Sequence, residues 1–283
     1  MPRASLSLPH GLRLDLHIHS TASDGSWSPE AVVRGAAKGG LDVIALSDHD
    51  NLSGFRTAEA TGRDVDVQVV PALEVSSTWR TRDIHVLGYF VDPDARALAD
   101  HATRAGRRRH ERMSQMLERL RARGIDVSMA AVEEAAGPAR NVVGRPHLAR
   151  VLVAAGHASS VPDAFDRLIG DQHDAFVPTA LLEPTGAVEL ILAAGGVPVW
   201  AHPPGDLVET LVPVLVRAGL RGLEVYRPRN QRTDIVRYEG ICRTSGLVMS
   251  GGSDWHTPDG GATLGDFFVT GDEVEGLLAA GGM

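Results

Sequence analysis

Histidines and carboxylates recur along this sequence in short groups whose spacing suits metal binding. His17 and His19 lie two residues apart, and Asp254 and His256 repeat that spacing. In an extended strand, residues two apart point to the same face, so each pair can aim at one point. Imidazole nitrogens and carboxylate oxygens are ligands for zinc, manganese and iron ions. The histidines and carboxylates placed in these groups, at or near the ends of predicted strands, are His17, His19, Asp24, Asp48, His49, Asp50, Glu74, His85, His202, Glu224, Asp254 and His256.

The size of this set indicates more than one ion. A single ion with positions left open for water cannot use all of these side chains. Carboxylates packed together without cations would repel one another and take up protons. The single cysteine, Cys242, belongs to none of the groups, so nitrogen and oxygen donors alone are expected. We therefore predict two divalent ions about 3.5–4 Å apart, or three, with Mn²⁺ favoured over Zn²⁺ or Fe²⁺.

Seven short apolar runs, mostly separated by helical patterns, are predicted as strands. They cover residues 12–18, 41–46, 67–73, 84–90, 196–201, 222–226 and 246–251. Nearly every run carries a histidine or carboxylate at or near its carboxyl end. In a β/α barrel these ends converge on one face, whereas an open sheet gathers only those beside one crevice. The distribution therefore favours a barrel.

One stretch lacks the strand pattern and reads as helix after helix. We predict that residues 98–182 form an all-helical insertion that caps the substrate site, and that residues 1–97 and 183–283 form the barrel. Within the barrel, Ser28 and Pro29 predict the start of a helix that ends at Gly39. Further helices are expected over residues 184–194, 205–218, 230–244 and 272–280.

Composition bounds the class of protein and its partners. The chain has 283 residues, 43% of them hydrophobic, and a net charge of −8, which argues against binding to duplex DNA. It has no apolar run of membrane-spanning length and no secretory signal pattern at its start. With one cysteine it cannot form an internal disulfide, so we expect a cytoplasmic protein with no membrane partner. The oligomeric state stays open.

The chemical groups also follow a recognisable order. "DLHIHSTASDG", "ALSDHDNLSG", "PALEVSS", "IHVLGYFVD", "VPVWAHP" and "SGGSDWH" resemble the ordered motifs of the polymerase-and-histidinol-phosphatase (PHP) family of metal-dependent phosphoesterases. This resemblance implies an α/β fold, a distorted seven-stranded (β/α)7 TIM-like barrel. It also implies three metal sites, with Glu74 bridging. Their ligands would be His17, His19, Glu74 and Asp254 in the first, Asp24, His49 and His256 in the second, and Glu74, His85 and His202 in the third.

The predicted insertion narrows the resemblance to one branch of that family. "NVVGRPHLARVLVAAG" is similar to segments of nucleoside 3′,5′-bisphosphate phosphatases and of an exoribonuclease that trims short RNA from the 5′ end. The resemblance implies hydrolysis of the 3′-phosphate of a nucleoside 3′,5′-bisphosphate, with exoribonuclease activity on short RNA as a further activity. "GDQHDAFVP" and "YRPRN" depart from the branch pattern where substrate contacts are expected. A phosphomonoesterase acting on another metabolite, such as histidinol phosphate, is the alternative. A non-catalytic, metal-stabilised binding module is a more distant one.

Three side chains are candidates for catalytic proton transfer to the leaving oxygen. They are Asp254, His202 and Asp48. For Asp48 the alternative is a carboxylate that orients a ligand histidine.

Substrate contacts are expected at two places. Arg145 and His147 begin a helix of the insertion, where a guanidinium and the helix dipole suit a second phosphate. Arg229 and Asn230 follow the sixth strand on the same face of the barrel. By contrast, the arginines of "RAGRRRHERM" point in different directions around a helix, which predicts a solvated face.

Overall fold

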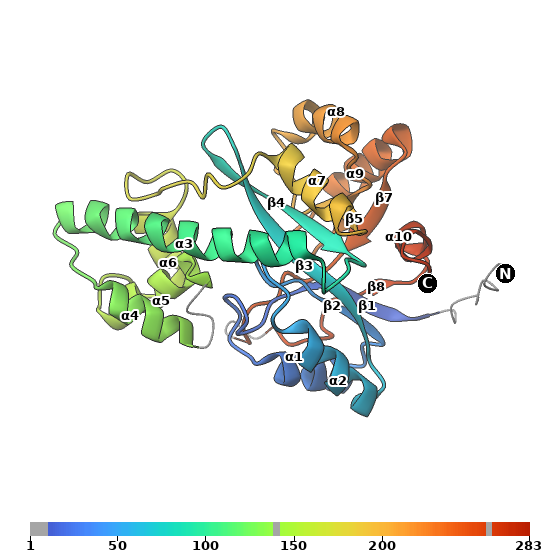
Figure 1. The fold of residues 1–283 in the computed structure, drawn as a ribbon, viewed down its shortest axis with the longest axis horizontal. Coiled ribbons are helices and arrows are strands. Elements are labelled where there is room, and N and C mark those ends of the chain that lie inside the picture. The colour runs from blue at the N-terminus through green and yellow to red at the C-terminus, as the bar shows by residue number, and fades with distance from the viewer. Residues whose placement is uncertain (1–10, 138–141, 259–261) are drawn as a thin grey trace.

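The computed structural model describes residues 11–137, 142–258 and 262–283, and its centre is one curved sheet of eight strands (Figure 1). The order across the sheet is β7-β6-β5-β4-β3-β2-β1-β8. The strands are β1 (Arg13–Ile18), β2 (Val43–Leu46), β3 (Gln68–Trp79), β4 (Arg82–Tyr89), β5 (Val197–Trp200), β6 (Gly222–Tyr226), β7 (Val248–Gly251) and β8 (Val269–Thr270). β1, β2 and β3 run parallel to one another, as do β5, β6 and β7.

The two ends of the sheet approach each other where β1 meets the segment after β7. The backbone N–H of Asp254 donates to the carbonyl of His17 at 2.8 Å, and that of His19 to the carbonyl of Trp255 at 2.9 Å. Gly252 permits this approach, because a Cβ there would lie 2.4 Å from the backbone nitrogen of His17. The sheet is therefore a nearly closed barrel, and the predicted α/β barrel class is confirmed.

Two strands differ from their expected form. The predicted strand at 67–73 continues to Trp79 and turns back directly into β4, so that Ser76 pairs with His85. β4 is antiparallel to both β3 and β5, and His85 lies toward its amino end rather than its carboxyl end. An antiparallel strand begins where its neighbours end, so His85 still reaches the same rim. The two-residue strand β8 was not predicted, because it is too short to show a period.

Helices cover the outside of the barrel (Figure 1). Ser28 caps the first of them as predicted, since its hydroxyl accepts a hydrogen bond from the N–H of Ala31. These helices are α1 (Pro29–Lys38), α2 (Phe55–Val65), α7 (Pro184–Ala193), α8 (Val208–Ala218), α9 (Arg232–Ser245) and α10 (Glu275–Ala280). No helix among the described residues is long and apolar enough to cross a membrane.

The helical insertion projects to one side of the barrel (Figure 1). It contains α3 (Arg96–Ala122), α4 (Met129–Ala136), α5 (Arg145–Ala154), α6 (Val161–Ala164) and a π-helical turn (Phe165–Ile169). Its buried apolar side chains, among them Met113, Met116 and Leu148, form a cluster of their own. Leu98, at the start of α3, packs instead into a cluster of the barrel. Division of the chain into two domains at residues 98 and 182 stays a prediction, although the separate cluster supports it.

Candidate metal centre

All nine predicted ligands lie together at one rim of the barrel. The two-residue period of β1 turns His17 and His19 to the same face, while Leu14 and Leu16 on the opposite face pack in a hydrophobic cluster. Both histidines are fully buried, with Nε2 atoms 3.1 Å apart. Both Nε2 atoms also lie 3.3–3.5 Å from carboxylate oxygens of Glu74 and Asp254. These four side chains thus surround a single point, and they are the residues predicted for the first site.

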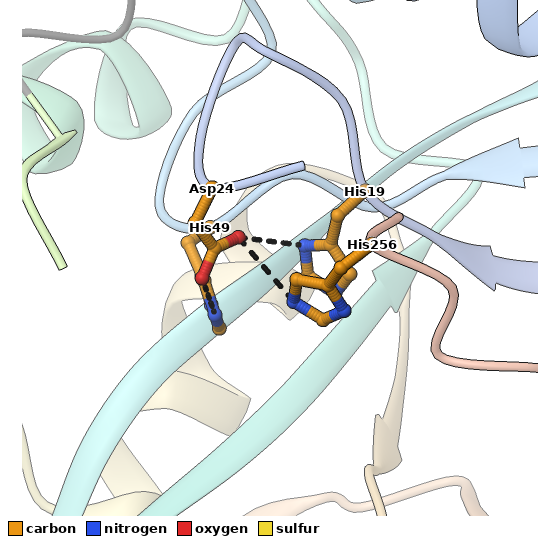
Figure 2. Close-up of side chains that lie close together, drawn as sticks. All are labelled: His19, Asp24, His49 and His256. Atoms are coloured by element: carbon orange, nitrogen blue, oxygen red, sulfur yellow. Dashed lines mark ion pairs between the residues drawn. The ribbon is translucent and has the colours of Figure 1, made fainter. Parts of the chain in front are cut away.

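A second group surrounds Asp24 (Figure 2). Its carboxylate oxygens lie 3.6 Å from His19 Nδ1, 3.6 Å from His49 Nε2 and 3.4 Å from His256 Nε2. One donor atom from each of the four residues lies within 4.8 Å of the others. Because a neutral imidazole has only one nitrogen lone pair, His19 can serve either this group or the first, but not both at once.

Glu74 is the centre of a third group. Its Oε1 lies 3.1 Å from His85 Nδ1 and 2.9 Å from His202 Nε2, while its Oε2 lies 3.2 Å from His49 Nδ1. Burial alone would raise the pKa of Glu74, but the surrounding histidines hold it well below its usual value. The same balance, with His256 and His49 as the partners, holds the pKa of Asp24 low. Both carboxylates are therefore ionised and able to bind cations.

The donor set fits divalent metal ions. It contains imidazole nitrogens and carboxylate oxygens only, and it is largely buried. Hydrogen bonding alone leaves the set unsatisfied, since the buried Nδ1 of His49 has no hydrogen-bond partner among the described residues. A cation shared between neighbouring side chains would satisfy such atoms. The clusters support metal binding, while the metal's identity and the assignment of each ligand stay predictions.

Behind the ligands, further buried carboxylates hold them in place. Glu224 on β6 accepts a hydrogen bond at 2.7 Å from Nδ1 of His17, which leaves Nε2 of that ring to face the centre. The other oxygen of Glu224 accepts from the backbone N–H of His202 at 2.7 Å. Asp15 accepts from the backbone N–H of Ser253 at 2.8 Å, and burial raises the pKa of Asp15 to about 6.

Asp48, a predicted catalytic residue, lies away from the open centre. Its carboxylate accepts hydrogen bonds from the N–H and hydroxyl of Ser20, at 2.8 and 2.7 Å, and from the hydroxyl of Ser23 at 2.6 Å. These contacts hold the loop between His19 and Asp24. A catalytic role for Asp48 stays a prediction, and the contacts favour its alternative role as a positioning residue.

A cavity of about 490 Å³ opens beside the ligands, and arginines form a further part of its lining, which we call the arginine wall. Arg145 is one of them: it pairs with Asp171, and its guanidinium lies 4.9 Å from the ring centre of Phe176. Arg229 also lines the cavity, is exposed, and has no hydrogen bond or ion pair to any described residue. The arginines of this wall are Arg109, Arg112, Arg145, Arg227 and Arg229.

The other two predicted substrate contacts point elsewhere. His147 is buried, and its Nδ1 accepts a hydrogen bond at 3.0 Å from the N–H of Gly144, which caps α5. Asn230 donates to the carbonyl of Val225 at 2.8 Å and closes the turn after β6. Neither side chain lines the cavity. Their roles in substrate binding stay predictions that this geometry does not favour.

Sequence reasoning missed three arginines of the wall. Within "RAGRRRHERM", Arg107 is exposed as expected, but Arg109 and Arg112 are each only 5% exposed and line the cavity, so a solvated face was wrong for these two. Arg227 donates to Asp254 at 2.9 Å. The only available signal was the three-residue spacing of Arg109 and Arg112, which puts both on one side of a helix.

Comparisons with known proteins agree with this site. The PHP domain family matches residues 15–131. A 5′-3′ exoribonuclease of Haemophilus influenzae is 33% identical, over 89% of this chain and 93% of its own. A 3′,5′-nucleoside bisphosphate phosphatase of Chromobacterium violaceum is 32% identical, over 89% and 90%. A phosphoribosyl 1,2-cyclic phosphate 1,2-diphosphodiesterase of Eggerthella lenta is 34% identical, over 86% and 93%.

A solved structure matches the fold. It belongs to a protein of Bifidobacterium adolescentis described as a metal-dependent phosphoesterase, and it is 28% identical with a TM-score of 0.83. The match covers 94% of this chain and 96% of the other. Together with the relatives, this likeness makes the chain an enzyme that hydrolyses phosphoester bonds with the help of metal ions.

Proposed function

Because this chain belongs to the PHP domain family of metal-dependent phosphoesterases, we propose a specific reaction for its metal centre. The reaction is hydrolysis of the 3′-phosphate of nucleoside 3′,5′-bisphosphates, such as the conversion of 3′-phosphoadenosine 5′-phosphate to AMP. One observation carries the proposal: a single cavity is lined both by predicted metal ligands and by arginines. A substrate with two phosphates can satisfy both walls at once.

Arg145 and Arg229 of the arginine wall would bind the phosphate that is not hydrolysed. The guanidinium of Arg145 lies 5.5 Å from the ring centre of Phe165, pairs with Asp171 and lies 3.6 Å from Asp83. Asp171 is exposed, so a phosphate entering the cavity can replace it as partner while the Asp83 side chain, only 5% exposed, stays in place. Arg229 is available as a second donor. The cavity volume of about 490 Å³ falls within the ordinary range for small-molecule sites and suits one nucleotide.

Beside the predicted metal ligands, the chain would position the phosphate to be cleaved. When bound, divalent ions, for which we propose Mn²⁺, supply charge neutralisation and increase the acidity of water. Asp254 has one oxygen facing His17 and His19 and the other held by Arg227, so its orientation is fixed from two sides. His202 is half-exposed and lines the cavity. We propose His202 as the best placed of the three predicted acids to donate a proton to the leaving 3′-oxygen, a role that requires its Nε2 to carry a proton and not to bind an ion.

A second candidate is 5′-3′ exoribonuclease activity on short RNA, favoured by the names of relatives from Haemophilus influenzae and Escherichia coli. The cavity lining offers little to a long strand. Among the described residues of the lining, Phe165 has the one aromatic ring other than histidine, and that ring lies against Arg145. Binding along a single strand usually needs several such rings for base stacking. We therefore propose short oligonucleotides, not long RNA or duplex DNA, as any polymeric substrate, and the cytoplasm as the place of action.

The test is phosphate release in the presence of Mn²⁺ from a panel of substrates. The panel contains 3′-phosphoadenosine 5′-phosphate, 5′-AMP, histidinol phosphate, a phosphoribosyl 1,2-cyclic phosphate and a 5′-phosphorylated trinucleotide. A strong preference for the bisphosphate with AMP as product is the expected result. Preference for histidinol phosphate or the cyclic phosphate would agree with the metal centre but would overturn the proposed bisphosphate substrate. Release of mononucleotides from the trinucleotide at a comparable rate would add the second activity.

A further inference from the structure

Arg109 is a buried cation that the proposed function does not yet use. It comes from α3, within the insertion, yet it reaches into the cavity among side chains of the barrel. Only 5% of the residue is exposed. A buried charge is costly unless it is paired and hydrogen-bonded. The contacts of each edge of its guanidinium therefore show what the side chain is placed to do.

One edge of the guanidinium is fixed by the barrel. Nε and Nη2 donate to one oxygen of Asp50 at 2.9 and 2.7 Å, and Nη2 also donates to the hydroxyl of Ser76 at 2.7 Å. The second oxygen of Asp50 is itself held, by the N–H of Ser76 at 2.8 Å and by Nε2 of His101 at 2.9 Å. The guanidinium is thus locked in orientation before any substrate arrives.

The other edge faces the cavity. Nη1 of Arg109 has no hydrogen-bond partner among the described residues, although a guanidinium has five N–H donors to satisfy. A Cβ placed on Gly144 would lie 3.6 Å from this Nη1 and 3.9 Å from Oδ2 of Asp24. Nη1 of Arg109 and the predicted metal ligand Asp24 therefore both lie beside Gly144, where no side chain separates them.

We propose that Arg109 is a catalytic residue that binds the phosphate undergoing hydrolysis. Nη1 donates to a non-bridging oxygen of that phosphoryl group in the cavity beside Gly144, which Asp24 and His49 also line. A preorganised donor stabilises negative charge that grows in the transition state, and it does so most strongly away from bulk water. The inference rests on the proposed phosphoesterase function and adds that the insertion supplies part of the catalytic wall.

The test compares Arg109→Lys and Arg109→Gln with wild type. Lysine keeps the positive charge beside Asp50, so Arg109→Lys should fold. Its ammonium group cannot pair with Asp50 and also donate to a phosphate in the cavity. We expect kcat/KM to fall about 100-fold in both variants. The loss should be equal for 4-nitrophenyl phosphate and for 3′-phosphoadenosine 5′-phosphate, because both contain the phosphate that is cleaved. The inhibition constant of inorganic phosphate should rise about tenfold or more.

Two further variants sharpen the test. Arg107→Gln changes an exposed arginine of the same helix with no hydrogen bond or ion pair to any described residue, and it should behave like wild type. Gly144→Ala adds a methyl group at ordinary contact distance from Pro146, 3.4 Å, so it should fold. Because the methyl group would lie 3.6 Å from Nη1 of Arg109, it should crowd a phosphate oxygen bound there and weaken inhibition by inorganic phosphate, as the Arg109 variants do.

Bound manganese, measured by mass spectrometry, separates the alternatives. We expect each Arg109 variant to retain the wild-type manganese content. Loss of manganese with activity would make Arg109 a positioning residue that acts through Asp50, and would overturn the inference. A loss confined to the bisphosphate would overturn it too, since Arg109 would then bind the other phosphate. Wild-type activity in Arg109→Lys refutes the inference alone, whereas an inactive wild type refutes the proposed function.

Discussion

The two walls of the cavity are held in place by different means. On the ligand wall, histidines and carboxylates of the barrel rim contact one another directly, as Glu74 does with His85 and His202. On the arginine wall, three arginines pair with carboxylates outside the ligand set: Arg109 with Asp50, Arg112 with Asp83, and Arg145 with Asp171 and Asp83. Arg227 differs from them, because it pairs with the predicted ligand Asp254 and with Glu224.

Because of this difference, we expect the structure of the ligand wall to depend on bound metal ions more than that of the arginine wall does. The carboxylates of the ligand wall need cations to offset their repulsion, so that wall is complete only when ions are bound. Arg109, Arg112 and Arg145 have counter-charges outside the ligand set, so these three keep their places without metal. Changes to the ligand wall should therefore affect metal binding and turnover. Changes to Arg145 should affect substrate binding, and changes to Arg109 the cleaved phosphate, both at constant metal content.

The largest effect is expected for Asp254→Asn on the ligand wall. The change removes a charge that faces His17 and His19, and it removes one of the two carboxylates that pair with Arg227. Turnover should fall on the order of 1,000-fold, while circular dichroism should show an unchanged fold. Asp266→Asn, at an exposed turn, is the matched control and should retain full activity. Substantial turnover by Asp254→Asn would contradict the assignment of this wall to the chemistry.

A smaller effect on the same wall is expected for Glu224→Gln. Its side chain does not reach the centre but orients His17, and glutamine can still accept that hydrogen bond without the charge. The affinity for Mn²⁺ should fall about tenfold or more, with kcat close to wild type at saturating metal. Activity measured across a series of Mn²⁺ concentrations tests this. An unchanged midpoint would show that Glu224 does not support the ligand wall.

On the arginine wall, Arg145→Ala should act on binding. We expect KM for 3′-phosphoadenosine 5′-phosphate to rise about tenfold, the value of a charge-assisted hydrogen bond, with little change for 4-nitrophenyl phosphate. Manganese content should match wild type. Steady-state kinetics on the two substrates provide the measurement. An equal rise in KM for both would remove Arg145 from recognition of a second phosphate.

The smallest effect on activity, with a clear effect on stability, is expected at His147. Burial lowers its pKa to about 4, so the folded protein keeps this ring neutral. The unfolded chain takes up the proton near pH 6.5, so stability present above that pH is lost as the pH falls toward 4. The shift corresponds to about 3 kcal/mol at most.

His147→Asn tests this, because its side-chain oxygen can still accept from Gly144. Urea unfolding from pH 7 to pH 4 should show a shallower decline for the variant, with activity at pH 7 close to wild type. The same slope in both proteins would mean that the ring is not held neutral. Loss of activity at pH 7 would instead support the prediction that His147 contacts the substrate.

Much of the ligand wall was predictable because its geometry is local. The period of two in β1 puts His17 and His19 on one face in any strand. The convergence of strand ends in a barrel then brings in ligands from distant motifs. Even the wrong direction assumed for β4 did no harm, since an antiparallel strand places His85 at the same rim from its opposite end.

The arginine wall could not be predicted, because its geometry is not local. Arg107 and Arg109 lie two residues apart in one helix. The chain has one lysine, Lys38, and apart from its histidines every other basic residue is an arginine. Nothing in the sequence marks Arg109 as the buried one. Its partner Asp50 lies 59 residues away and meets it only because α3 packs across the barrel rim. The sequence by itself determined the barrel class and the set of predicted metal ligands, since both follow from strand periodicity and motif order. The tertiary structure alone decided which arginines face the cavity, because burial of one helix face depends on what the helix is packed against.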